Sequence, residues 1–129
     1  MTVDLSKYEV VGFIDKDLAN LTNCTYTDEI YAAPGVLKHI KKRHSNELSE
    51  DVLLNIIDTI KSILQTPEYI GTHPKKIGTS IEFVKRIDEN ILVATELDIK
   101  DNYIYVASMY PINQSKIENR LHSGRFKKL

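Results

Sequence analysis

The chain of 129 residues is 42% hydrophobic and 27% charged, with a formal net charge of −1 at pH 7, as expected for one ordinary globular domain. No apolar run approaches the roughly 20 residues that a membrane-spanning helix needs. The single cysteine, Cys24, excludes an intrachain disulfide and argues against a structural zinc site.

The N-terminal part is predicted to contain one strand and a polar connector. The stretch YEVVGFI (8–14) is rich in β-branched and aromatic residues and predicts a short strand. The stretch DKDLANLTNCTYTDE (15–29) is rich in Asn, Thr and Asp and predicts a turn-rich connector with few fixed contacts. Residues 1–33 hold six acids against two lysines, so they form an acidic N-terminal extension.

The stretch GVLKHIKKRH (35–44) predicts a helix that begins near Pro34, a favoured residue in a first turn. His44 follows the apolar residues of this stretch at spacings of three and four, which places it on the apolar face of the helix. His39 and Arg43 lie together on a neighbouring face because they are four residues apart. The polar side carries Lys38, Lys41 and Lys42.

A second, longer helix is predicted from Ser49, a good N-cap residue, to the residue before Pro67. Its apolar residues recur with helical spacing over a broad face. The next stretch, PEYIGTHPKKIGT (67–79), contains two prolines and two glycines and predicts a loop or a bent edge segment. This segment carries Lys75 and Lys76.

The C-terminal half predicts three strands, SIEFVKRI (80–87), ILVATELD (91–98) and NYIYVASMY (102–110). The connections are so short that neighbouring strands should pair as antiparallel hairpins. The final stretch, SKIENRLHSGRFKKL (115–129), predicts a basic helix that frays.

The element order predicts an α+β domain, with two helices from the N-terminal half packed on an antiparallel meander of about four strands. We expect a single domain, made of the extension 1–33, a core at 34–113 and a basic tail at 114–129.

Two strand residues are candidates for chemistry. Lys85 shares a strand face with Phe83, so it must reach the edge of the sheet or meet an anion, unless that face is turned to solvent. Ser108 shares a strand face with Val106 and Tyr110 in the predicted last strand. The commoner explanation for such a serine is a buried hydroxyl bonded to the backbone.

His39 and His44 are the candidates for general acid–base catalysis, because histidine titrates near neutral pH. Cleavage of RNA by its own 2′-hydroxyl needs a base, an acid and cations around the phosphorane, and two histidines with Lys85 and Arg43 match these needs in kind. The alternative is that both histidines are structural. A metal shared by the two is disfavoured, because a spacing of five places them about 140° apart around a helix.

Cations are gathered into patches although the whole chain is nearly neutral. Residues 34–44 carry four cations and no acid, and residues 103–129 carry five cations and one acid. Such patches can attract a polyanion, whereas the alternative is a basic tail with no function.

Several motifs together resemble a known family. The order is H-I-K-K-R-H, a long apolar helix that ends in T-P-E-Y-I-G, then S-I-E-F-V-K, I-L-V-A-T-E-L-D and I-Y-V-A-S-M-Y. This arrangement is similar to that of a phage-associated nuclease family in the barnase, EndoU, colicin tRNase and RelE superfamily, whose members occur as domains of phage and mobile-element proteins. The resemblance covers residues 34–113.

The resemblance implies a barnase/RelE-like fold and metal-independent endoribonuclease activity that yields a 2′,3′-cyclic phosphate without a cofactor. It implies RNA as the substrate, with tRNA as a candidate, and a role as a toxin or as a phage or mobile-element effector. An immunity or antitoxin protein is then a candidate partner. The N-terminus, MTVDLSKYEV, lacks the features of a signal peptide, so we expect a cytoplasmic protein that does not bind a membrane.

The family's site residues map onto His39 and His44 in the helix, Lys85 in the strand and Ser108 in the late strand. This mapping implies that His44 is the principal acid–base group, that Lys85 stabilises the phosphorane charge and that Ser108 orients the phosphate. Residues expected to contact the RNA are Arg43, Lys38, Lys42, Tyr110, Lys75 and Lys76.

Two other functions are compatible with the same residues. The first is a catalytically inactive module on the same fold that binds RNA or a protein, and the second is a structural or regulatory phage protein with a solvated basic surface. A further hypothesis is that the acidic connector lies across the basic site and restrains it, although simple packing of the N-terminus is an alternative.

Overall fold

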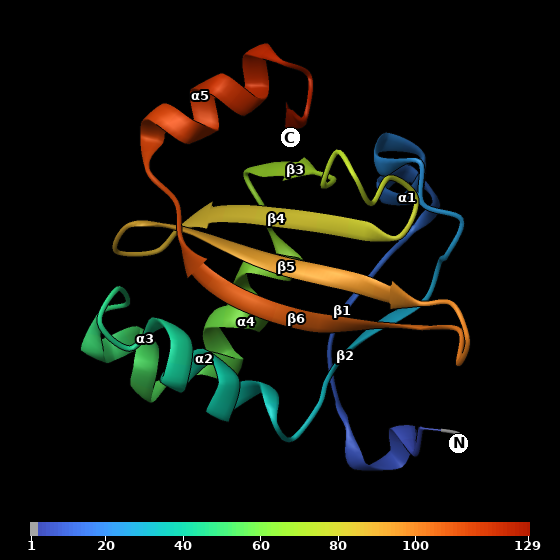
Figure 1. Cartoon of the computed structure of the whole chain (residues 1–129), viewed down its shortest axis with the longest axis horizontal. Helices are drawn as coiled ribbons and strands as arrows, with labels where there is room; N and C mark the ends of the chain where they lie inside the picture. The colour runs from blue at the N-terminus through green and yellow to red at the C-terminus, as the bar shows by residue number, and fades with distance from the viewer. Residues whose placement is uncertain (1–2) are drawn as a thin grey trace.

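One mixed β-sheet organises the domain (Figure 1). The computed structural model describes residues 3–129, which contain seven strands, five α-helices and one short 3₁₀ helix, η1 (Leu5–Lys7). The strands are β1 (Glu9–Phe13), β2 (Glu29–Ala32), β3 (Tyr69–Gly71), β4 (Ser80–Arg86), β5 (Asn90–Asp98), β6 (Tyr103–Pro111) and β7 (Phe126–Lys128). The helices are α1 (Lys16–Thr22), α2 (Val36–His44), α3 (Glu50–Leu54), α4 (Ile56–Gln65) and α5 (Gln114–His122).

The strands lie in the order β1-β2-β6-β5-β4-β3-β7. All neighbours are antiparallel except β2 and β6, which pair in parallel through Ile30 with Ile104 and Tyr31 with Tyr105. The predicted α+β class and the meander β4-β5-β6 are therefore confirmed. The prediction of about four antiparallel strands and two helices was wrong, because β2, β3 and β7 have only three or four residues each, too few to show a periodic pattern.

The two predicted helices are present, but the second one is divided. In α2, Val36 and Ile40 are buried, as the spacing predicted. The Ser49 side chain accepts a hydrogen bond from the Val52 N–H and caps α3. Asn55 then leaves the helical conformation (φ −132°, ψ 44°), so a separate helix, α4, follows.

The predicted N-terminal connector is more ordered than expected. The Asp15 side chain accepts from the Leu18 N–H and caps α1, which ends at Asn23 in the left-handed conformation. The chain then forms β2, so β1 and β2 are strands of the common sheet. The signal for α1 was the acidic N-cap at its start, which the surrounding Asn and Thr residues obscured.

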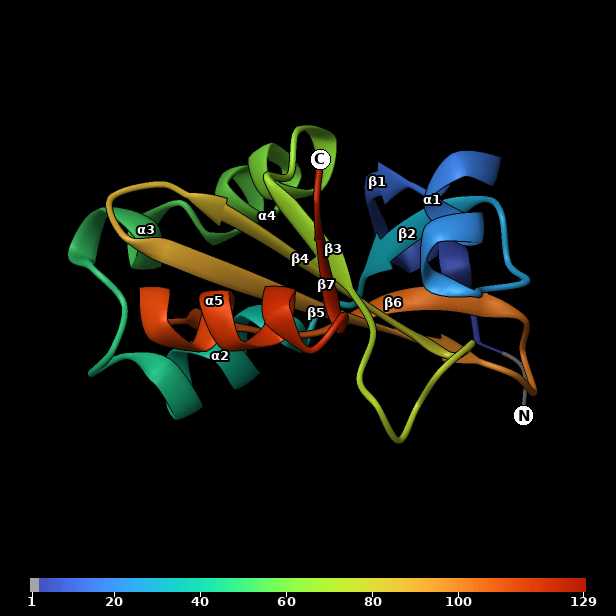
Figure 2. The same ribbon diagram turned by 90° about the horizontal axis from the view of Figure 1, so that it is seen from above.

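The two faces of the sheet are covered to different extents. The main core lies between the sheet and α2, α3 and α4, whereas α5 covers one end of the opposite face with a smaller core of Val84, Leu92, Ile112, Ile117 and Phe126. Figure 2 shows α5 and the loop between β3 and β4 on one side of the sheet, with α4 on the other. The remaining part of the α5 side is called the open face below. None of the helices in residues 3–129 is long and apolar enough to cross a membrane.

The strand β6 contains a β-bulge. Thr95 of β5 pairs with Val106, but the adjacent residue Ala94 pairs with Ser108. Ala107 is therefore an extra residue in β6, and it interrupts the alternation of side chains between the two faces.

The bulge decides which side chains reach the open face. Regular alternation would place Ser108 on the same face as Val106, which is in the main core. The extra residue instead turns Ser108 and Tyr110 to the open face, and Met109 takes the next core position. The prediction that Ser108 shares a face with Val106 was therefore wrong, although the prediction that it shares a face with Tyr110 is confirmed.

The helix α2 continues where β2 ends. After its two parallel pairs with β6, β2 stops, and α2 then packs against β6 with Val36 and Ile40 in the same core as Met109. The C-terminal end of α2 therefore lies beside the second half of β6, where Ser108 and Tyr110 face outward.

The close contact between β3 and β7 generates a prediction. A Cβ atom on Gly71 would overlap the carbonyl oxygen of Arg125 and the ring of Phe126, whereas a Cβ atom on Gly35 would meet nothing within 4 Å. We expect Gly71→Ala to lower the free energy of unfolding by about 1–3 kcal/mol, the usual range for overpacking. Gly35→Ala is the matched control and should unfold like the wild type in urea and on heating. Equal stability of the two variants would contradict this packing.

Candidate active site

Three residues form a row across the open face. Glu82 of β4 pairs with Ala94 of β5, and Ala94 pairs with Ser108 of β6. Because neighbouring strands lie about 4.8 Å apart, Glu82 and Ser108 are separated by about 10 Å across the small alanine. A cavity of about 180 Å³ lies here, with Glu82, Ala94 and Tyr110 among its lining residues.

His44 reaches this row from the end of α2. Its Nε2 atom lies 3.3 Å from Ser108 Oγ, and its Nδ1 atom lies 3.4 Å from Glu47 Oε1. The ring stacks at a tilt on Tyr110, with 5.4 Å between the ring centroids. The carboxylate beside Nδ1 favours the tautomer with its proton on that atom, which leaves Nε2 as an acceptor on the open face. With 20% of its side chain exposed, His44 is half-buried and still accessible.

A buried ion pair lies at the other end of the row. Glu82 is 4% exposed. Its Oε1 accepts from Nη2 (2.8 Å) and Nε (3.1 Å) of Arg125, and its Oε2 accepts from Nη2 (3.0 Å). This bidentate geometry holds the guanidinium at the edge of the open face. The nearby Arg120 guanidinium lies over the Phe126 ring, 5.3 Å from its centroid.

Tyr110 is close to both ends of the row, because its ring stacks on His44 and it lines the cavity together with Glu82. Burial raises the pKa of Tyr110 above its usual value of 10.0, and the Glu82 carboxylate adds to this effect, while Arg120 and Arg125 oppose it. The phenol is therefore a neutral hydrogen-bond donor at physiological pH.

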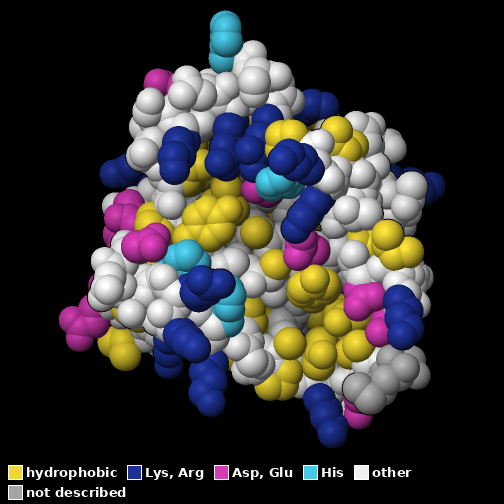
Figure 3. All heavy atoms as spheres, viewed as in Figure 1, with side chains coloured by type: hydrophobic (Ala, Val, Ile, Leu, Met, Phe, Trp, Pro, Cys, Tyr) yellow, Lys and Arg dark blue, Asp and Glu magenta, His cyan; other side chains and the backbone are white. Residues whose placement is uncertain are grey.

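Cations flank the open face. Figure 3 shows Lys and Arg side chains, with histidines among them, on both sides of an apolar centre, over α5 above and over α2 below. The residues Lys38, His39, Lys42 and Arg43 of α2 are exposed, as is Lys75. Lys76 forms an ion pair with Glu96, and this hydrogen bond raises the pKa of Lys76. Within residues 3–129, the His39 ring makes no hydrogen bond, in contrast to His44.

The structure does not bring Lys85 to this site, and the prediction that Lys85 joins His44 and Ser108 is corrected. Lys85 does share a face with Phe83, but α4 covers that face. Its Nζ atom donates to Thr66 Oγ1 (2.7 Å) and to Ser62 Oγ (3.1 Å). The partners of Lys85 are therefore two hydroxyl groups one helical turn apart, and not the anion that the sequence suggested.

The acidic residues of the N-terminal part also lie elsewhere. Figure 2 shows α1 next to β1 and β2, on the side of β6 where α4 lies. Glu9 forms an ion pair with Lys61 of α4 (2.6 Å), and within the described chain no acid of residues 3–33 is paired with a cation of α2. The hypothesis that the acidic connector covers the basic site is therefore not supported by its position.

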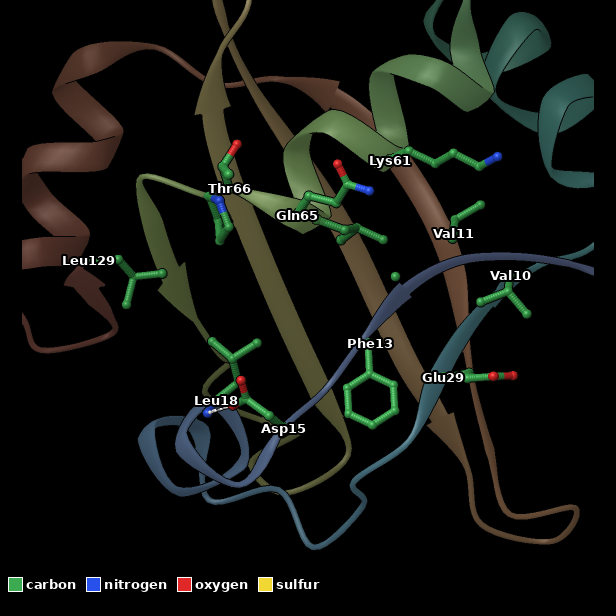
Figure 4. A pocket seen from close by; sticks show the side chains of 13 residues that line it. Val10, Val11, Phe13, Asp15, Leu18, Glu29, Lys61, Gln65, Thr66 and Leu129 are labelled. Atoms are coloured by element: carbon green, nitrogen blue, oxygen red, sulfur yellow. Dashed lines mark hydrogen bonds between the residues drawn. The ribbon is translucent and has the colours of Figure 1, made fainter.

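A more voluminous cavity, of about 810 Å³, lies beside β1 and the end of α4 (Figure 4). Figure 4 shows Val10, Phe13 and Leu129 around it, with the Lys61 amine pointing away from the hollow. No histidine lines it. Its ionisable lining residues are Asp15, Glu29 and Lys61, and none of the residues that the sequence predicted for catalysis is among them. The smaller cavity beside Tyr110, next to His44 and Ser108, is therefore taken as the candidate site. Within residues 3–129, no group of three His, Cys, Asp or Glu side chains is arranged to hold a metal ion.

Sequence reasoning missed four residues of this site: Glu47, Glu82, Arg120 and Arg125. Glu82 alternates with buried residues in its strand and therefore looked like an ordinary exposed charge. Arg125 lies in the tail that was expected to fray. Instead, Gly124 (φ +85°) reverses the chain after α5, and Arg125 leads directly into β7. The spacing of Glu47, three residues after His44, was a local signal that could have been used.

A half-buried histidine and a carboxylate–arginine pair are groups of the kinds that transfer protons and stabilise negative charge. The chain belongs to the family described as phage-Barnase-EndoU-ColicinE5/D-RelE like nuclease3, whose model matches residues 8–119. It is therefore a phage-associated nuclease of this type, which confirms the resemblance found in the sequence. No curated protein and no solved structure matches the chain.

The position of Lys85 generates a second prediction. We expect Lys85→Met to lower the free energy of unfolding by about 1 kcal/mol, because two hydroxyl groups of α4 lose their donor. Binding of RNA and its dependence on salt should not change, because the lysine is on the covered face. Lys100→Met, in the exposed turn before β6, is the matched control for thermal unfolding and for gel-shift titration. Weaker RNA binding by a Lys85→Met protein that melts like the wild type would contradict a structural role.

Proposed function

We propose that the protein is a metal-independent endoribonuclease that cleaves RNA by attack of a 2′-hydroxyl group and leaves a 2′,3′-cyclic phosphate. The observation that carries this proposal is the row of Glu82, Ala94 and Ser108 across the open face, with Glu82 at one end and His44 beside Ser108 at the other. Attack at phosphorus needs proton transfer at two oxygens on opposite sides of the phosphate, and the site offers one ionisable group at each end.

The proposed reaction uses these groups in one displacement. A base takes the proton of the 2′-hydroxyl as its oxygen forms a bond to phosphorus, and an acid gives a proton to the 5′-oxygen as the P–O5′ bond breaks. His44 and Glu82 are the two proton-transfer groups. Arg125, already held by Glu82, faces the negative charge that develops on the phosphorane, and the Tyr110 phenol can donate to a phosphate oxygen. Arg125 thus has the role that the sequence assigned to Lys85.

The RNA backbone would lie along the open face. On one side it meets the exposed cations Lys38, Lys42 and Arg43 of α2, and Lys75 projects from the loop before β4. These lysines and arginines are suited to phosphate contacts, which give affinity with little sequence preference. Within this proposal, tRNA is a candidate substrate. The activity would serve as a toxin or a phage effector, with an immunity protein as a candidate partner.

Cleavage of RNA in the presence of EDTA tests the proposal directly. We expect the wild-type protein to give discrete fragments of total bacterial RNA that end in 2′,3′-cyclic phosphate. His44→Ala should lower the cleavage rate by about a hundredfold or more, the usual cost of removing an acid–base group. His39→Ala is the matched control on the same helix and should cleave nearly as fast as the wild type, because His39 is exposed and it is His44 that contacts Ser108.

Other outcomes of this experiment have distinct meanings. A rate loss in His39→Ala with normal cleavage by His44→Ala would move the chemistry to the other face of α2. RNA that stays intact but is bound by the wild type in a salt-dependent manner would favour the inactive RNA-binding module. Neither cleavage nor binding would contradict the proposed function.

Ser108 provides a separate prediction about the mechanism. In the proposed reaction its hydroxyl orients the imidazole and the phosphate, so Ser108→Ala should slow cleavage by about tenfold, the effect of one lost hydrogen bond. The same contacts among Ser108, His44 and Glu47 would also suit a serine nucleophile, for which the loss would be almost complete. Single-turnover rates of Ser108→Ala and the wild type on one RNA oligonucleotide distinguish the two roles.

A further inference from the structure

We infer that a second cavity, beside the active site, binds a neighbouring nucleotide of the RNA strand. This inference rests on the proposed function, because the nucleotide would belong to the strand that is cleaved. The cavity has a volume of about 640 Å³ and lies between the end of α1, the loop before β4 and the connection from α5 to β7. This volume is within the usual range for sites that bind small organic ligands.

The charges around this cavity favour an anion. Arg120, Arg125 and Lys127 line it, and no acid does. Arg125 is neutralised by Glu82, but within residues 3–129 neither Arg120 nor Lys127 forms an ion pair. The Lys127 ammonium donates only to the backbone oxygen of Leu21 (3.1 Å), and Nη1 of Arg120 is buried without a partner among the described residues. Two positive charges therefore remain uncompensated at one cavity, which suits a phosphate group.

Part of the lining of the cavity is apolar. Leu21, Pro74 and Ile77 line it, and Ile77 is 60% exposed although it is a large hydrophobic residue. Hydroxyl and amide groups, among them those of Thr72 and Asn119, are also present. A lining that combines apolar residues with two cations is complementary to a nucleotide, whose base is flat and largely apolar on its faces and whose phosphate is charged.

The cavity adjoins the active site. Arg125 lines it and at the same time binds Glu82, which lines the 180 Å³ cavity on the open face. The loop before β4 contributes Thr72 to one cavity and His73 to the other. A strand with one phosphate beside Glu82 and Arg125 could therefore place a further nucleotide in the second cavity. Arg120 and Lys127 lie beyond residue 119, where the family match ends, so the family assignment does not account for this site.

Nucleotide binding to the full chain tests this inference without any cleavage. The probes are adenosine 5′-monophosphate, adenosine and inorganic phosphate, followed through the backbone amide signals in NMR titrations. Adenosine 5′-monophosphate should shift the signals of Asn23 and Gly124 and should bind more tightly than either of the other probes. Lys127→Gln should weaken its binding by about tenfold, whereas Lys128→Gln should not. The control is matched because both lysines are exposed in β7 and their side chains alternate in direction.

A second pair of variants tests the apolar part of the lining. Ile77→Ser should weaken binding of adenosine 5′-monophosphate but not of inorganic phosphate. Ile99→Ser, which changes another exposed isoleucine (74% exposed) in the turn after β5, should change neither. Equal affinity for the nucleotide and for inorganic phosphate would overturn the inference in favour of a simple anion site. Equal effects of Lys127→Gln and Lys128→Gln would overturn it altogether.

The inference and the proposed function fail in different experiments. The probes contain no phosphodiester bond, so an inactive protein can still bind them. If cleavage occurs, Lys127→Gln should raise KM and leave kcat unchanged, because the contact is equally strong before and during the reaction. Binding of a non-cleavable 2′-O-methyl oligonucleotide by Lys127→Gln should also depend less on salt, with a slope reduced by about one. Cleavage by Lys127→Gln with normal KM and normal salt dependence would support the proposed nuclease activity and contradict the proposed subsite.

Discussion

The open face depends on one extra residue in β6. Without the bulge at Ala107, Ser108 would point into the main core and Tyr110 would follow it. A serine and a tyrosine would then need buried partners, and the row from Glu82 through Ala94 would end in an apolar side chain. The bulge thus separates two uses of the same strand: its first half is a core element, and its second half is a wall of the site.

The second half of β6 can pack against α2 because β2 is short and pairs only with the first half of β6. Two parallel pairs suffice to fix β2 against β6, after which α2 covers the core beside the strand and carries His44 to the open face. The opposite wall is built by α5 and β7, which are held to the sheet by the pair of Glu82 and Arg125. The family match includes the first wall but ends inside α5. Glu82 of the second wall lies inside the matched residues 8–119, whereas its partner Arg125 lies beyond them.

The parts of this structure that could be predicted from the sequence are those with a local signal. The apolar stripe of α2, the N-cap of α3 and the meander β4-β5-β6 follow from spacing, capping and turn length. The bulge has no such signal, because an inserted residue is recognisable only against the register of the partner strand. Lys85 was misjudged for a related reason: its face was identified, but the hydroxyl groups of Ser62 and Thr66 that satisfy it come from another element. Glu82 and Arg125 are 43 residues apart, and neither alone indicates a buried pair.

The long sequence separations in the site have a consequence for folding. His44 meets Ser108 across 64 residues and Glu82 meets Arg125 across 43 residues. Closing such loops costs conformational entropy before any contact is gained, and the parallel pairing of β2 with β6 adds another distant contact, so topology predicts slow folding relative to a helical domain of this size. Local elements such as α2 or the β4-β5 hairpin can form early, but neither wall of the site is complete in them. The arrangement of the candidate site thus arises only in the native state, and an intermediate of this chain would have its basic helix without Ser108 beside His44 or Arg125 beside Glu82.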